Sequence, residues 1–180
     1  MSSPYGSLAD LFGIVLRPRI FISYYHDANQ WYYDQLSTQL HDQYSLVTDR
    51  SLDDEIDSDD CDYVMRRIRE EFITGTSCTF VLFGTQTWTR KYVDWETKAT
   101  LDKEHGLIGV ALPAFKYTQH LVPRRLWDNY MTGYAVLTDW WTLTTNAQSV
   151  PLFVAQASAK PSSLINNSRE MMSCNAYGLV

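Results

Sequence analysis

Five short runs rich in apolar and β-branched residues are spaced along the chain. They occupy residues 19–24 (RIFISY), 44–48 (YSLVT), 79–83 (TFVLF), 106–112 (GLIGVAL) and 134–140 (YAVLTDW). Apolar runs of this length are typical of strands that are buried on both faces. The run at 79–83 is the clearest, because Gly75 precedes it and Gly84 follows it directly.

Stretches with a helical spacing of apolar residues lie between these runs. Trp31, Leu36 and Leu40 predict a helix that ends near His41. Further helices are predicted over residues 63–72, 88–103 and 152–159. Strands that alternate with helices in this way predict βα units around a mainly parallel sheet, so the fold class is α/β.

The N-terminal region has the pattern of a short amphipathic helix that ends at Pro18. Ser7 and Asp10 resemble a capping box. Five apolar residues share one helical face: Leu8, Leu11, Phe12, Val15 and Leu16. No basic face accompanies them, which favours packing against the same chain over oligomerisation or binding to a membrane surface. We therefore predict a helical extension over residues 1–18, followed by the main domain over residues 19–145.

The C-terminal region loses its periodicity. Residues after Pro161 are rich in Ser and Asn, and chain ends of this kind are commonly poorly ordered. We predict that residues 146–180 form a helix and then a tail whose last fifteen or so residues lack order.

Charge is concentrated in one segment, over residues 49–62, where eight of fourteen residues are acidic and one is Arg. Such a segment predicts an exposed loop that leads into the next helix. The formal net charge of the chain is −6, and neither half carries a clear excess of basic residues. A nucleic acid is therefore not an expected partner.

Three cysteines, Cys61, Cys78 and Cys174, show neither CxxC spacing nor a His pattern that would hold zinc. We expect reduced thiols, no metal and a cytoplasmic protein. The longest apolar stretches fall far short of the roughly 20 residues that a membrane helix needs. The N-terminus also lacks the basic region of a signal peptide.

Several familiar catalytic and nucleotide-binding motifs are absent. The chain has no GxGxxG after the first predicted strand and no GxxxxGK[ST], GxSxG or HExxH. A receiver-type site would need an acceptor Asp after the central strand, but TFVLF is followed by Gly84, Thr85 and Gln86. These absences exclude the best-known phosphate cradles, hydrolase elbows and zinc helices.

The segment 85–100, TQTWTRKYVDWETKAT, is the remaining candidate for chemistry. On a helix, Tyr92, Trp95 and Ala99 share the face that packs on the sheet, and Glu96 lies at the edge of that apolar stripe. Taken alone, a Glu in such a position is usually a solvated edge residue.

Four features together resemble the TIR-like branch typified by the Thoeris ThsB proteins of bacterial antiphage defence: FISY at residues 21–24 with Trp31 downstream, the acidic loop, TFVLFG, and TQTWTRKYVDWE. The resemblance covers roughly residues 19–112. In that family a strand that ends in Gly precedes a G-S/T-Q-T-aromatic stretch, two basic residues, an aromatic and an aromatic-Glu pair. These positions are filled by Gly84, Thr85, Gln86, Thr87, Trp88, Arg90, Lys91, Tyr92, Trp95 and Glu96.

The resemblance implies a flavodoxin-like TIR fold that cleaves NAD at its nicotinamide glycosidic bond, with Glu96 as the catalytic glutamate. NAD is then the substrate, and no cofactor is expected. The product would be a cyclic or conjugated ADP-ribose messenger that activates a separate effector after a phage-derived trigger. Residues 49–60 would gate the pocket or contact a neighbouring copy. The alternative is a TIR-like assembly module without turnover, in which Glu96 is a surface residue.

Further substrate-binding residues are predicted at the end of the first strand, where open α/β sheets bind ligands. Ser23, Tyr24 and Tyr25 lie there, and a tyrosine ring could stack on nicotinamide or adenine. Packing at the strand end remains an equal alternative for the two tyrosines. His26 follows closely, but a lone surface His is more often inert.

The turn before Glu96 supplies three more candidates. Arg90 and Lys91 are predicted to meet a diphosphate, with a solvated helix start as the alternative. Trp88 is predicted to bind substrate or, alternatively, to anchor the helix in the core. In this arrangement Trp88 and Trp95 brace the helix from the sheet side, and Glu96 lines a concave site with Ser23, Tyr24 or Tyr25.

Overall fold

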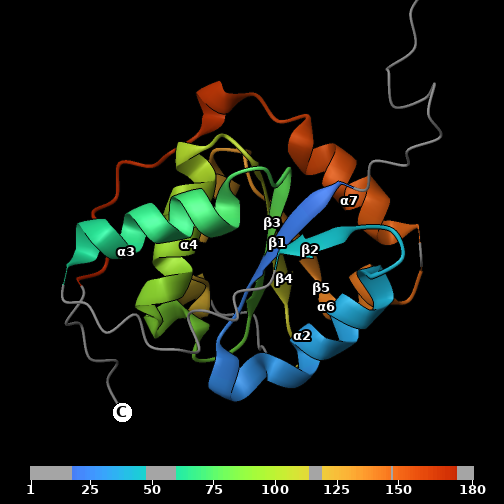
Figure 1. The fold of residues 1–180 in the computed structure, drawn as a ribbon. Coiled ribbons are helices and arrows are strands. Elements are labelled where there is room, and N and C mark those ends of the chain that lie inside the picture. The colour runs from blue at the N-terminus through green and yellow to red at the C-terminus, as the bar shows by residue number, and fades with distance from the viewer. Residues whose placement is uncertain (1–17, 48–59, 114–118, 147, 174–180) are drawn as a thin grey trace, which may run out of the picture.

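A sheet of five parallel strands is the centre of the computed structural model, which describes residues 18–47, 60–113, 119–146 and 148–173 (Figure 1). The strands are β1 (Arg19–Ser23), β2 (Ser45–Val47), β3 (Cys78–Phe83), β4 (Gly106–Ala111) and β5 (Val136–Asp139). Their order is β2-β1-β3-β4-β5, and each neighbouring pair is parallel. This is the flavodoxin-like order of doubly wound folds. The predicted α/β class and parallel sheet are therefore confirmed.

Helices cover both faces of the sheet. One face carries α2 (His26–Leu40), α6 (Trp140–Thr144) and α7 (Ser149–Ser158), which lie together on the right in Figure 1. The opposite face carries α3 (Cys61–Arg67) with its π-helical continuation η1 (Ile68–Ile73), α4 (Lys91–Asp102) and α5 (Arg124–Met131). Three 3₁₀ turns complete the described elements: η2 (Thr87–Thr89), η3 (Gln119–Leu121) and η4 (Ser162–Leu164).

The central strands are buried on both sides, as their continuous apolar runs predict. Phe80 and Leu82 of β3 pack with α2, α6 and α7, beside Ile108 and Val110 of β4, and all four side chains are fully buried. The intervening residues of β3 point to the opposite cluster, which contains side chains of α4 and α5. A strand that is buried on both faces has no solvent-exposed side. The sequence of β3 therefore shows no alternation of apolar and polar residues.

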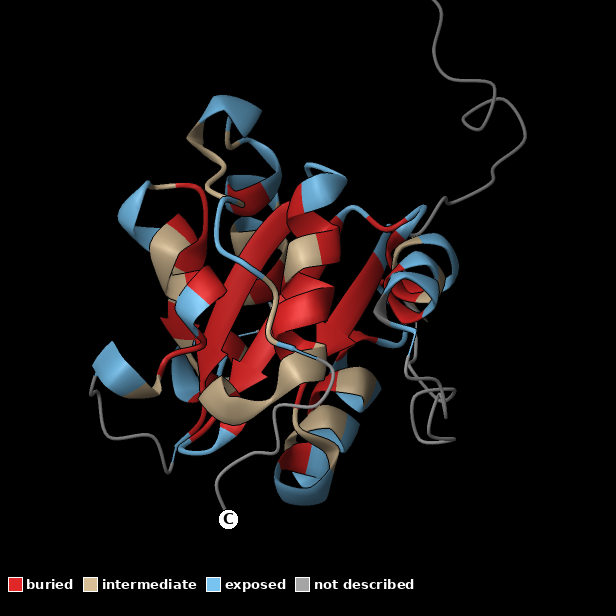
Figure 2. Ribbon diagram, turned by 90° about the vertical axis from the view of Figure 1, so that its left-hand side faces the viewer, coloured by how far each residue is buried: buried red, intermediate tan, exposed pale blue. Residues whose placement is uncertain are grey.

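Helix α4 is enclosed by neighbours on most of its circumference, and Figure 2 shows it mainly in the colour of buried residues. Trp95 and Ala99 pack against Phe21 of β1 and side chains of α3 and η1. Val93 and Leu101 pack into the second cluster, with β3, β4 and α5. The prediction of one apolar stripe on α4 was therefore too narrow, because two apolar faces are buried.

The beginning of the predicted helix over residues 88–103 also differs. Thr87–Thr89 form a separate 3₁₀ turn, and the α-helix starts at Lys91. Arg90 between them has an extended backbone, with φ −92° and ψ 112°. Because of this break, the Arg90 side chain does not follow the helical spacing of the side chains of α4.

The prediction that the last fifteen or so residues lack order is wrong as far as residue 173. Residues 166–172 lie against α4 and α5, where Asn166 exchanges two hydrogen bonds with Asn129 (2.8 and 2.9 Å). The indole Nε1 of Trp95 donates to the carbonyl of Met172 (2.8 Å). The sequence signal was missed because these partners are more than 35 residues away from the tail.

Some predictions fall on residues that are not described. These are the helix over residues 7–16, the acidic loop up to residue 59, and residues 174–180. Asp60 is described, and its carboxylate caps α3 by accepting from the backbone N–H groups of Asp62 and Tyr63. Within the described ranges, no helix is both long and apolar enough to cross a membrane.

Candidate active site

The side chains of Ser23 and Glu96 meet beside the sheet. The Ser23 hydroxyl donates a hydrogen bond of 2.5 Å to Oε2 of Glu96. Ser23 is the last residue of β1, and Glu96 lies in the second turn of α4. Their exposed fractions are 1% and 3%, so Glu96 is not the solvated edge residue that its helical position alone predicts.

Packing of α4 on β1 explains why these two residues meet. Phe21 of β1 and Trp95 of α4 share one apolar cluster with α3 and η1. Both apolar residues are close in sequence to the hydrogen-bonded residues. Ser23 follows Phe21 by two residues, and Glu96 follows Trp95 directly. The apolar contact therefore sets the position of the carboxylate at the carboxyl end of β1, the edge at which open α/β sheets bind ligands.

The turn before α4 is held by a buried hydroxyl. Thr87 Oγ1 accepts a hydrogen bond from the backbone N–H of Gly84 (2.9 Å) and one from the Asn29 side chain of α2 (3.4 Å). Thr87 and Asn29 are both buried. Buried polar groups paired in this way restrict the backbone. Sequence reasoning missed Asn29, although Thr87 belongs to the TQT stretch that carried the resemblance.

Tyr24 is packed between two other rings. It lies nearly parallel to His26 (centroids 4.3 Å apart) and to Tyr33 (4.6 Å apart). Two rings this close to Tyr24 cannot share one of its faces without overlapping, so they occupy both. Its hydroxyl donates to the Gln30 side chain (2.9 Å). These contacts are those of strand-end packing, the alternative that the sequence left open for this residue.

Tyr25 is linked to the turn before α4 instead. The guanidinium carbon of Arg90 lies 3.6 Å from the centroid of the Tyr25 ring, a close cation–π contact. The Tyr25 hydroxyl donates to Asp27 (2.7 Å), and this hydrogen bond raises the pKa of Tyr25 above its ordinary value. Arg90 is therefore attached to the same strand end that carries Ser23.

Lys91 and Trp88 take different directions. The Lys91 ammonium lies 5.0 Å from the ring centroid of Tyr92 and 5.7 Å from that of Trp95. Trp88 does not brace α4 from the sheet side, because it is half-buried in η2 and lines a surface pocket. That part of the predicted arrangement is wrong, since the helix is broken at Arg90.

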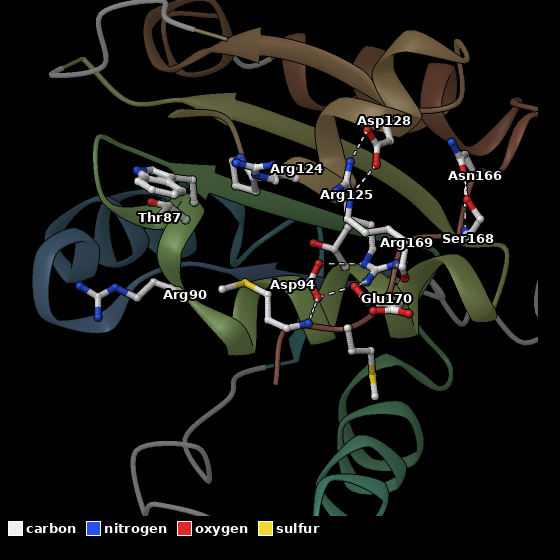
Figure 3. A pocket seen from close by; sticks show the side chains of 15 residues that line it. Thr87, Arg90, Asp94, Arg124, Arg125, Asp128, Asn166, Ser168, Arg169 and Glu170 are labelled. Atoms are coloured by element: carbon white, nitrogen blue, oxygen red, sulfur yellow. Dashed lines mark hydrogen bonds and ion pairs between the residues drawn. The ribbon is translucent and has the colours of Figure 1, made fainter. Parts of the chain in front are cut away.

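The pocket has a volume of about 680 Å³ and lies between η2, α4, α5 and the C-terminal segment 166–172 (Figure 3). It is lined by Thr87, Trp88, Arg90, Asp94, Thr97, Pro123, Arg124, Arg125, Asp128, Asn166, Ser168, Arg169, Glu170, Met171 and Met172. Glu96, Ser23, Tyr24 and Tyr25 are not in its lining. Of the predicted site residues, Trp88 and Arg90 line the pocket, whereas Lys91 lies outside both the pocket and the strand-end group. Arg90 also contacts Tyr25 of the strand-end group.

A buried and compensated ion pair lies at the centre of this pocket. Arg125 is fully buried and makes a two-pronged ion pair with Asp94 of α4 (2.9 and 3.2 Å). It also donates to the backbone carbonyls of Arg169 and Glu170 in the C-terminal segment. Nothing local in the sequence marks Arg125 as buried, because its partners come from two distant segments.

Metal and thiol chemistry have little support among the described side chains. In the described ranges, no group of three or more His, Cys, Asp and Glu residues is arranged to hold a metal ion. Cys78 is a free cysteine inside β3, and burial raises the pKa of its thiol. A buried thiol with a raised pKa is a poor nucleophile.

These features define a class of protein. The strand order 2-1-3-4-5, with helices on both faces, is that of a flavodoxin-like α/β domain, the fold class to which TIR-like domains belong. The family described as "Thoeris protein ThsB, TIR-like domain" matches residues 21–117, which is more than half of the chain. The chain belongs to this family, as the resemblance predicted.

A curated relative carries a more specific name. The "Putative cyclic ADP-D-ribose synthase ThsB1" of Bacillus cereus (strain MSX-D12) is 34% identical over 55 residues. The match covers 31% of this chain and 29% of the relative. Because the chain spans less than a third of that relative's length, the similarity supports the family more strongly than any particular reaction.

Proposed function

We propose that this protein cleaves the bond between nicotinamide and ribose in NAD, with Glu96 as the catalytic carboxylate. The observation that carries the proposal is the buried hydrogen bond between Ser23 and Glu96 at the carboxyl end of β1. The family match and the name of the Bacillus cereus relative support the same substrate class.

The chemistry needs one well-placed negative charge. When the C1′–N bond of NAD breaks, its electron pair goes to the nicotinamide nitrogen, so nicotinamide leaves as a neutral molecule without an acid. Positive charge then develops on the ribose ring, as in glycoside hydrolysis. A carboxylate with little exposure to water stabilises this charge more strongly than a solvated one, because less solvent screens it.

The Ser23 hydroxyl acts as a positioning group in this proposal. Its hydrogen bond orients the Glu96 carboxylate before substrate binds. A ribose hydroxyl can replace this donor when substrate enters, which keeps the carboxylate paired throughout. Water then attacks C1′ and gives ADP-ribose plus a proton, or another nucleophile on the ADP-ribose attacks and gives a cyclic or conjugated messenger.

The wider role follows from the family. We infer that the messenger activates a separate effector protein, that a phage-derived trigger starts its synthesis, and that the protein acts in the cytoplasm, where NAD is available. Self-assembly belongs to the same proposal. The support is the Thoeris ThsB family match.

The alternative is an assembly module without turnover, and its expectation that Glu96 is a surface residue is wrong, because only 3% of Glu96 is exposed. Purified protein incubated with NAD, with and without extract of phage-infected cells, separates the two. Release of nicotinamide, measured by chromatography, supports catalysis. An absence of release even with infected-cell extract, from protein that unfolds cooperatively, would establish the module instead.

A further inference from the structure

The arginines of the pocket are not equivalent. Arg125 and Arg169 are neutralised by two-pronged pairs with Asp94 and Asp128. Arg124, the first residue of α5, is exposed and has no carboxylate partner among the described residues. Figure 3 shows Arg124 toward the end of the pocket at which Thr87 lies, and the ion pairs nearer its centre. One end of the pocket therefore offers an uncompensated positive charge.

Arg90 lies at the same end and is also incompletely paired. Its Nε atom is buried but has no hydrogen-bond partner in the described part of the chain. A buried donor without a partner is uncommon and costs free energy, so it indicates a missing acceptor. The guanidinium lies over Tyr25, and in Figure 3 the side chain points away from Asp94.

The remaining lining at this end suits an aromatic base. Trp88 contributes a half-buried indole at this end. Met171 and Met172 line the pocket as well, where the Met172 backbone N–H donates to Asp94. Indole and thioether groups pack well on flat rings, and guanidinium groups bind phosphate oxygens with directed hydrogen bonds. The volume of about 680 Å³ lies in the ordinary range for small-molecule sites.

Arg90 connects this pocket to the catalytic pair. It lines the pocket, its guanidinium covers Tyr25, and Tyr25 follows Ser23 by two residues. Arg90 therefore lies between the pocket and the strand end that carries Ser23. A dinucleotide has the matching order of groups, because a diphosphate joins its two nucleosides.

We propose that the pocket binds the adenosine end of NAD, with the base against Trp88 and the diphosphate near Arg90 and Arg124, while the nicotinamide ribose reaches Glu96. This assignment rests on the proposed function. It adds Arg124, on a different helix from Glu96, as a residue that determines substrate specificity.

Steady-state kinetics with two substrates test the assignment. Arg124→Ala is expected to raise KM for NAD about tenfold or more, since a charge-assisted hydrogen bond to phosphate is lost, and to change kcat less than about twofold. Nicotinamide riboside lacks both the diphosphate and the adenosine, so its KM is expected to stay unchanged. Arg66→Ala, which removes an exposed arginine on α3, is the matched control. An unchanged KM for NAD, or an equal rise for both substrates, would overturn the assignment.

A binding measurement keeps this test independent of turnover. Calorimetry with ADP-ribose and the Glu96→Gln protein is expected to show binding that Arg124→Ala and Trp88→Ala each weaken about tenfold. Equal affinity in all variants would refute the pocket whether or not the enzyme is active. If these variants do weaken binding but the wild-type protein never releases nicotinamide, the pocket stands and the proposed function fails. If ADP-ribose inhibits non-competitively against NAD, the pocket is a separate regulatory site and the assignment is wrong.

Discussion

Two buried carboxylates lie two residues apart on α4 and have different surroundings. Asp94 faces α5, where it pairs with the Arg125 guanidinium and accepts the backbone N–H of Met172 (3.1 Å). Glu96 faces the end of β1, where it accepts a neutral hydroxyl from Ser23. A buried cation compensates the charge of Asp94, whereas the hydrogen bond from Ser23 brings no charge of its own to Glu96.

Asp94 therefore has a structural role on one side of α4, and the proposed catalytic role of Glu96 belongs to the other side. The Asp94 side joins three segments, because Arg125 also holds the backbone of residues 169–170. The Glu96 side joins α4 to β1. Substitutions on the two sides should therefore affect different measurements, stability on the first and turnover on the second.

The largest effect is expected from Arg125→Ala. It leaves Asp94 buried and without its cation, and losing one member of a buried pair typically costs about 3–5 kcal/mol of unfolding free energy. Urea unfolding followed by circular dichroism measures this. Arg66→Ala removes an exposed arginine and should change the free energy by less than about 0.5 kcal/mol. If Arg125→Ala lowered the unfolding free energy by less than about 1 kcal/mol, the structural role of the Asp94 side of α4 would be refuted.

The next effect concerns turnover. Glu96→Gln keeps the shape of the side chain and removes its charge, so the barrier should rise by about 2.7–4 kcal/mol, a hundredfold or more in rate. Release of nicotinamide from NAD is the readout. Glu70→Gln makes the same chemical change at an exposed site of η1 and should retain full activity. Messenger production by Glu96→Gln at the wild-type rate would show that the catalytic residue lies elsewhere.

A smaller effect on turnover is expected from Ser23→Ala. The Glu96 carboxylate remains but loses its orienting donor, which should lower kcat about tenfold, or about 1.4 kcal/mol. The acidic limb of the dependence of kcat on pH should also move to higher pH, because the lost hydrogen bond favours the charged form of the carboxyl group. An unchanged pH profile with reduced stability would mean that Ser23 only packs at the strand end.

The smallest effect is expected from Trp95→Phe. Phe keeps most of the packing beside α3 but removes the indole donor to the Met172 carbonyl, so unfolding free energy should fall by about 1 kcal/mol. Limited proteolysis should then cut the C-terminal segment faster. Unchanged cleavage would indicate that the other contacts, those of Arg125, Asn129, Asp128 and Asp94, hold this segment without the Trp95 hydrogen bond.

Residues whose environment depends on neighbours in sequence could be predicted well. The runs at 79–83 and 106–112 are short, apolar and β-rich, and they are the buried strands β3 and β4. The helix predicted to end near His41 is α2, which ends at Leu40. The GTQT…WE spacing identified the helix after the central strand and the family.

Residues whose environment depends on distant contacts were predicted less well. Tyr24 could be a stacking platform or a packing residue on sequence alone, and His26 and Tyr33 decide that it is enclosed. Arg125 looked like an ordinary charged residue because Asp94 and the carbonyls that satisfy it are brought together only by folding.

The sequence by itself determined the α/β class, the parallel sheet and the position of Glu96 on the helix after β3. These features could be read from the sequence because the period of apolar residues and the spacing of a motif are local properties. The tertiary structure decided which side of that helix is structural. Asp94 and Glu96 are both acidic residues of one short segment, and no local pattern distinguishes them. The difference arises when α5 places a guanidinium against Asp94 and β1 places a hydroxyl against Glu96, since the charge of a buried carboxylate depends on the partner that packing brings to it.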